Sequence, residues 1–113
     1  MAFLDRAFYS SGASFAFKLG ASVAVARRGG TTASFDAMNK YFGICQMPVV
    51  CSTYCNQVHV AVPGEAEEDA EGLQTMRNLA RNMAWMLKCF EAGKAAGVAL
   101  PQTERDYKTN FIR

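Results

Sequence analysis

The chain has 113 residues, of which 50% are hydrophobic and 19% are charged, and its formal net charge is +2. This composition is typical of one small globular domain and excludes a disordered chain. The small net charge does not favour nucleic acid or a polybasic membrane contact, and no apolar run approaches the ~18 residues of a spanning helix. Asp5 and Arg6 place charge where a secretory signal would be apolar, so we expect a cytoplasmic protein.

The first predicted element is a helix over residues 3–9, in which apolar side chains repeat on one helical face. No Ser, Thr, Asp or Asn precedes this face as a cap, and Ser10-Ser11-Gly12 is predicted to end the helix in a turn. Because a natural domain rarely begins in mid-helix, we expect the missing part of the domain to be supplied either by residues upstream or by a partner chain.

A continuous run of small apolar residues, Leu19–Ala26, predicts a strand that is covered on both faces in a parallel sheet. The turn Arg27-Arg28-Gly29-Gly30 follows it and leads into a helix, which is the layout of a βα loop. Ligands of open parallel sheets bind at the carboxyl ends of the strands. The turn offers backbone N–H groups, positive charge and room for a ligand. It is therefore a candidate binding site; the alternative is a turn whose arginines are only solvated.

The helix after this turn is predicted to be capped by Thr31 or Thr32 and to end at Gly43. Its inner face is formed by Phe35, Met38 and Phe42. A second short strand is predicted at residues 47–52, with Pro48 near its start, where a missing N–H is tolerated. Strand, helix and strand make one βαβ unit, which is expected to be right-handed.

The four cysteines are loosely spaced, and only Cys51 and Cys55 are close, separated by three residues. Zinc sites usually combine two close Cys or His pairs. We therefore favour reduced thiols in a cytosolic protein over a metal or iron–sulfur site. The single histidine, His59, lies in a polar loop predicted over residues 53–64, and a lone histidine is more often structural than catalytic.

A long helix is predicted from about Glu67 to Gly93, and the acidic run at its start matches the helix dipole. The apolar stripe of this helix consists of Leu73, Met76, Ala80, Met83, Leu87 and Phe90. Residues 1–100 are predicted to belong to one domain and residues 101–113 to an extended tail, with Phe111 and Ile112 as its apolar anchors.

Two strands cannot cover the apolar faces of three helices or pair all of their own edges. The sheet is therefore expected to continue through strands that lie upstream or in a partner chain.

Five segments, taken in this order, resemble the C-terminal part of the NADPH-dependent FMN reductase family. They are Phe3-Leu4-Asp5-Arg6, Ala26-Arg27-Arg28-Gly29-Gly30-Thr31-Thr32, Met47-Pro48-Val49-Val50, Glu71-Gly72-Leu73-Gln74-Thr75-Met76 and Thr109-Asn110-Phe111-Ile112-Arg113. The resemblance implies an α/β fold, a flavodoxin-like three-layer sandwich with a parallel sheet in the order 2-1-3-4-5. This chain would hold strands four and five and the last helices, and the first three strands would be absent.

The resemblance also implies that the loop after strand four lies along the isoalloxazine ring of FMN. The cofactor-binding residues are then Ala26, Arg27, Arg28, Gly29, Gly30, Thr31 and Tyr54. Members of the family often have Gly and Trp where this chain has Cys51 and Cys55, which puts a stacking role at Cys55 in question. No catalytic side chain is expected, because the cofactors carry the hydride transfer.

The function implied by the resemblance is an FMN-dependent NAD(P)H oxidoreductase that passes electrons to a small acceptor. Its cofactors are FMN and NAD(P)H, and it is a homodimer or homotetramer in which Trp85 suits a contact between subunits. The alternative is a non-catalytic partial domain that serves as an oligomerisation or interaction module. A different nucleotide-binding βαβ module is less favoured, because Gly-x-Gly-x-x-Gly and Gly-Lys-Ser/Thr fingerprints are missing.

Overall fold

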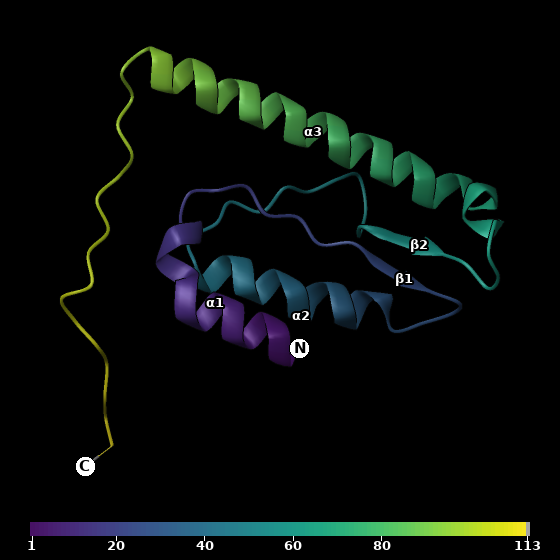
Figure 1. Ribbon diagram of the computed structural model, residues 1–113, viewed down its shortest axis with the longest axis horizontal. Helices are drawn as coiled ribbons and strands as arrows, with labels where there is room; N and C mark the ends of the chain where they lie inside the picture. The colour runs from purple at the N-terminus through teal and green to yellow at the C-terminus, as the bar shows by residue number, and fades with distance from the viewer. Residues whose placement is uncertain (113) are drawn as a thin grey trace.

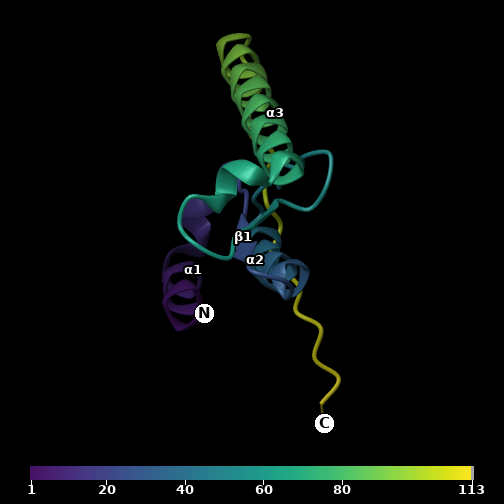
Figure 2. The same ribbon diagram turned by 90° about the vertical axis from the view of Figure 1, so that its right-hand side faces the viewer.

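The computed structural model describes residues 1–112 and has a mixed α/β architecture, as the sequence predicts. Its elements in chain order are α1 (Ala2–Phe15), β1 (Ala24–Ala26), α2 (Thr31–Ile44), β2 (Gln57–His59), a 3-10 helix η1 (Glu65–Glu68) and α3 (Ala70–Ala95). Figure 1 shows α3 on one side of the two strands and α1 with α2 on the other side. Figure 2, turned by 90°, shows the same order of layers.

The two strands pair in parallel, with Ala24 opposite Gln57 and Ala26 opposite His59. A parallel bridge between Gly20 and Val49 extends this ladder towards the amino ends of the strands. The predicted strand at residues 19–26 is therefore reduced to three residues and one bridge.

The second strand lies later in the chain than the sequence predicts. Residues 47–52 contribute only the bridge at Val49, whereas β2 falls inside the predicted loop 53–64. Between the bridge and β2 the chain leaves the ladder, and we call residues 51–55 the excursion. The prediction is wrong in position because hydrophobicity marks Val49 and Val50, whereas the ladder resumes at a polar residue, Gln57.

The excursion is held against α3 by side chains. Three hydrogen bonds join them: Ser52 Oγ to Thr75 O (2.7 Å), Asn82 Nδ2 to Cys51 O (2.8 Å) and Asn78 Nδ2 to Thr53 Oγ1 (3.3 Å). These bonds satisfy polar groups of a segment that has no sheet partner.

The predicted helix boundaries hold only in part. α1 is kinked at Ser11 (φ −127°, ψ 16°), so the predicted turn Ser10-Ser11-Gly12 does interrupt the helix, but helical structure then continues to Phe15. α2 is capped by Gly30 in the left-handed conformation, and Thr31 is already helical, so neither threonine is its N-cap. The expected lack of a side-chain cap on the first helix is confirmed, because Met1 occupies that position.

α3 begins at Ala70, and its buried face is formed by Gly72, Thr75 and Leu79 rather than by the predicted apolar stripe. The C-terminal half of α3 extends past the two strands (Figure 1), and Trp85, Leu87 and Phe90 are exposed there. The predicted apolar stripe is therefore wrong in register: the small residue Gly72 and the polar residue Thr75 pack against β2 and the excursion.

The buried core is small. It holds Ala24, Cys45, Val50, Val58 and Leu79, and the radius of gyration is 17.3 Å. A compact domain of this length would have a radius of about 13 Å. Val23 and Val25 of the β1 segment are exposed, and within residues 1–112 no third strand pairs with the sheet. The molecule therefore leaves apolar surface and strand edges uncovered.

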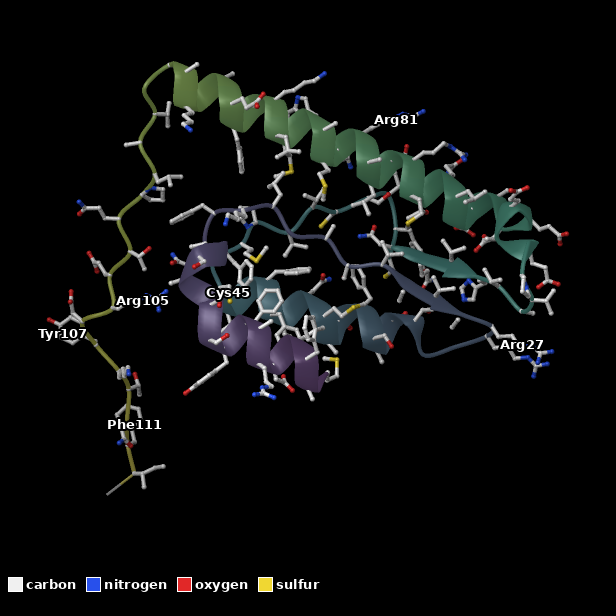
Figure 3. The ribbon with its side chains drawn as sticks, in the orientation of Figure 1. Arg27, Cys45, Arg81, Arg105, Tyr107 and Phe111 are labelled. Carbon is white, nitrogen blue, oxygen red and sulfur yellow. The ribbon has the colours of Figure 1, made fainter. Side chains whose placement is uncertain are left out.

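The tail after Pro101 contains neither helix nor strand up to residue 112, as predicted, and its last predicted residue, Arg113, lies outside the described residues. The expected anchors are wrong: Phe111 and Ile112 are both exposed. Figure 3 shows Phe111 on the outlying tail, away from the helices.

Candidate functional site: the loop between β1 and α2

The predicted binding loop begins where β1 ends. The carbonyl oxygen of Ala26 accepts the N–H of Val60 at 3.1 Å, so the strand is paired up to its last residue. The chain then turns through exposed residues 27–29 to Gly30, whose φ of 88° lies in the left-handed region that favours glycine. The carboxyl end of a parallel strand thus leads directly into the N-terminus of α2.

The N-terminus of α2 has free hydrogen-bond donors. Gly30 provides no side-chain cap, and the first backbone bond of the helix runs from Ser34 N–H to Gly30 O, at 3.0 Å. The N–H groups of residues 31–33 therefore have no acceptor within the helix. Together with the helix dipole, these groups favour an acceptor atom or a negative charge in front of the helix.

Two arginines add positive charge to this loop. Arg27 and Arg28 are both exposed, and the ion pair of residues 1–112 joins His59 and Asp69, so neither arginine meets a carboxylate there. Figure 3 shows Arg27 pointing away from the body of the molecule. A Cβ atom at Gly29 or Gly30 would meet nothing within 4 Å. A ligand can therefore approach the backbone of the turn closely.

Of the seven residues predicted to contact the flavin, five lie together and exposed or half-buried in this loop, and the other two, Thr31 and Tyr54, do not. Ala26 to Gly30 follow one another along the loop, but Thr31 is only 5% exposed, so its hydroxyl group is not available to a ligand. Tyr54 is 62% exposed and belongs to the excursion, before β2. Because the strands are parallel, Tyr54 lies at their amino end, whereas the arginines follow the carboxyl end of β1.

Tyr54 instead borders a small polar pocket of about 60 Å³ that also involves His59, Asp69 and Thr75. The Asp69 carboxylate accepts the backbone N–H of His59 at 2.7 Å and that of Gly72 at 2.8 Å. These two hydrogen bonds, the one from His59 first, lower the pKa of Asp69 below its ordinary value. Nδ1 of His59 lies 3.8 Å from the same carboxylate. His59 thus has a structural partner.

Asp69 is the residue that sequence reasoning missed. It is the N-cap of α3, and its signal is an aspartate immediately before the helix. The neighbouring glutamates obscure this signal. Because acidic residues in general favour a helix N-terminus, the start of the helix is expected at Glu67 rather than after Asp69.

The four cysteines are free thiols, and only Cys45 is buried. Within residues 1–112, no cluster of three His, Cys, Asp or Glu side chains could hold a metal ion. In the same part of the chain, none of the helices combines the length and the apolarity that crossing a membrane requires.

Comparison of the chain with protein-family models, with curated proteins and with solved structures gave no match. The function of the loop is therefore inferred from its geometry and from the sequence resemblance described above.

Proposed function

We propose that this chain forms part of a flavodoxin-like, FMN-dependent NAD(P)H oxidoreductase, in which the loop from Ala26 to Thr31 contacts the flavin ring. The observation that carries the proposal is the N-terminus of α2, which has no side-chain cap. It follows the carboxyl end of a parallel strand, and the connecting loop contains two arginines without ion-pair partners. Ligands of open α/β sheets bind at this edge.

The donors of the loop fit the flavin. The pyrimidine edge of the isoalloxazine ring carries two carbonyl oxygens and N1, which accept hydrogen bonds, and an N3–H group, which donates one. The loop offers unpaired backbone N–H groups beside them and open space over Gly29 and Gly30. The phosphate of FMN needs a further site, which the resemblance assigns to a loop after strand one, outside this sequence.

When bound, FMN supplies hydride transfer from NADPH or NADH and the passage of electrons to a small acceptor. The residues of this chain hold and orient the ring edge through backbone N–H groups. The guanidinium of Arg27 or Arg28 stabilises negative charge near the ring, or binds a phosphate of the nicotinamide nucleotide as a bidentate donor. No side chain of the loop needs to act as an acid or base.

The uncovered sheet supports the same proposal. β1 has a neighbour on one edge only within the described residues, and Val23 and Val25 are exposed beside it. A further parallel strand along β1 would pair this open edge, and a helix packed on the enlarged sheet would cover the two valines.

The proposal is tested by titrating FMN with the purified protein and following the quenching of flavin fluorescence. We expect quenching by the wild type, at least tenfold weaker binding by the variant Arg27→Ala/Arg28→Ala, and unchanged binding by Arg77→Ala, an exposed arginine on α3. Addition of NADPH should then bleach the bound flavin. If the wild type leaves FMN fluorescence unquenched, the proposal that the loop of this chain contacts the flavin is overturned.

A second candidate function, an oligomerisation or interaction module, is favoured by the C-terminal half of α3. Trp85 there is 67% exposed, and Leu87 and Phe90 are exposed near it. Sedimentation of the wild type and of Trp85→Ser tests this function. A stable oligomer that dissociates in the variant, together with unquenched FMN, would favour the module over the enzyme.

A further inference from the structure

A hollow of about 760 Å³ lies between α1, α2 and the tail, and we call it the α1–α2 hollow. Its walls include Arg6, Phe8, Tyr9, Tyr41, Ile44 and Arg105. Figure 3 shows Cys45 and Arg105, which also border it, at the opposite end of the molecule from Arg27. The volume falls within the ~300–1,000 Å³ of small-molecule sites.

The wall of the hollow is aromatic and open to a ligand. The ring of Phe8 packs on Tyr41 with 5.3 Å between centroids, which fixes the two rings relative to each other. Tyr9 and Ile44, at the rim, are 96% and 80% exposed. Aromatic rings held in this way provide faces and edges on which a planar ligand can pack.

The charges around the hollow favour an anion. Arg6 and Arg105 both border it, and neither forms an ion pair within residues 1–112. The acidic residue at the wall, Asp5, accepts the hydroxyl of Tyr41 at 2.5 Å, so one of its oxygens is already engaged. Two guanidinium groups and one carboxylate therefore border the hollow, so its net charge is positive. Guanidinium groups bind carboxylates, sulfonates and phosphates through paired hydrogen bonds.

The tail brings the second arginine to the hollow. Thr103 Oγ1 donates to Oε1 of Gln46 at 3.0 Å, just beyond the end of α2. This contact holds the tail two residues before Arg105, and Figure 3 shows the Arg105 side chain directed from the tail towards α1. The hollow is therefore bordered by one cation from helix α1, Arg6, and by one from the C-terminal tail, Arg105.

We propose that the α1–α2 hollow binds a small aromatic anion, whose ring packs on the wall formed by Phe8, Tyr9 and Tyr41 and whose anionic group lies between Arg6 and Arg105. This site is separate from the loop proposed to contact the flavin, and it does not depend on that proposal.

The test uses two dyes with the same ring system. The first is 8-anilinonaphthalene-1-sulfonate, an aromatic anion, and the second is N-phenyl-1-naphthylamine, which lacks the sulfonate. We expect the anion to bind with one-to-one stoichiometry and to shift the backbone amide resonances of residues 9–13 and 44–45. Arg6→Ala and Arg105→Ala should each weaken the binding of the anion about tenfold and leave the binding of the neutral dye unchanged.

The matched controls are Lys108→Ala, a basic residue of the tail, and Lys88→Ala on α3, neither of which borders the hollow. Both should leave the affinity for the sulfonate dye unchanged. Unaltered affinity in the double variant Arg6→Ala/Arg105→Ala would overturn the proposal. Shifts confined to residues 83–90 would also overturn it, because they would place the dye on the exposed half of α3. An FMN titration followed by the amides of residues 27–33 reports on the flavin proposal separately.

Discussion

The Asp69 carboxylate accepts the backbone N–H of His59 at 2.7 Å, so the residue that caps α3 also holds the last residue of β2. Its other oxygen accepts the N–H of Gly72, in the first turn of the helix. One side chain therefore joins the sheet to the helix that covers it.

Replacement of Asp69 by alanine should lower the melting temperature by several degrees, because the change removes a helix cap and leaves the N–H of His59 without its acceptor. Thermal unfolding followed by circular dichroism measures this effect. Glu67→Ala is the matched control, since Glu67 belongs to the same acidic run but is exposed. Equal melting temperatures for the two variants would contradict the role of Asp69.

The contribution of Asp69 should depend on pH in a defined direction. Hydrogen bonds from His59 and Gly72 lower the pKa of Asp69 in the folded protein below the ordinary value of 3.8. The stabilisation is therefore complete above the unfolded pKa and is lost as the pH falls through the folded pKa. The difference in melting temperature between wild type and Asp69→Ala should shrink below about pH 4. A difference that stays constant down to about pH 2 would refute this linkage.

Two glycines of α3 should respond in opposite ways to alanine. A Cβ atom at Gly72 would lie 2.5 Å from Asp69 Oδ2 and 3.1 Å from the carbonyl oxygen of Gln57, so Gly72→Ala should destabilise the protein by about 1–3 kcal/mol. A Cβ atom at Gly93 would make only ordinary contacts, at 3.9 Å or more, with Val98. Gly93→Ala should therefore stabilise the helix by about 0.5–1 kcal/mol. Denaturant unfolding of both variants measures whether the free energy of unfolding falls for Gly72→Ala and rises for Gly93→Ala.

Tyr41 should ionise at a higher pH than an ordinary tyrosine. Its hydroxyl donates to Asp5, and this hydrogen bond, followed by burial and by the charge of Asp5, raises the pKa of Tyr41 above 10.0. The stabilisation is present below the unfolded pKa and is lost as the pH rises through the folded pKa. A titration of the ring resonances should show the pKa of Tyr41 falling in Asp5→Ala. An unchanged pKa in this variant would exclude the contact with Asp5 as its cause.

Periodicity predicts the helices of this protein well and its strands poorly. The three predicted helices all exist, because each carries an apolar repeat over several turns. The strands are only three residues long, and β2 begins with the polar residue Gln57, so no alternation marks it. Its position follows from long-range pairing with β1, which local sequence does not encode.

In the candidate site too, features set by local sequence are predicted, whereas features set by long-range contacts are not. The turn from Arg27 to Gly30 is predicted correctly as the link between a strand and a helix, because two glycines after an apolar run are a local signal. The place of Tyr54 at the other end of the strand pair depends on the excursion. The joint role of Asp69 depends on a contact across ten residues. Neither could be inferred from spacing alone.

The excursion has a consequence for how this fold tolerates change. Between the two points at which the chain pairs with itself, the segment that leads into β1 advances by four residues, from Gly20 to Ala24, while the segment that leads into β2 advances by eight, from Val49 to Gln57. The additional chain is accommodated outside the ladder and bound to α3. We expect insertions there to disturb the hydrogen bonds of this loop to α3 and to leave both pairing points of the ladder in place.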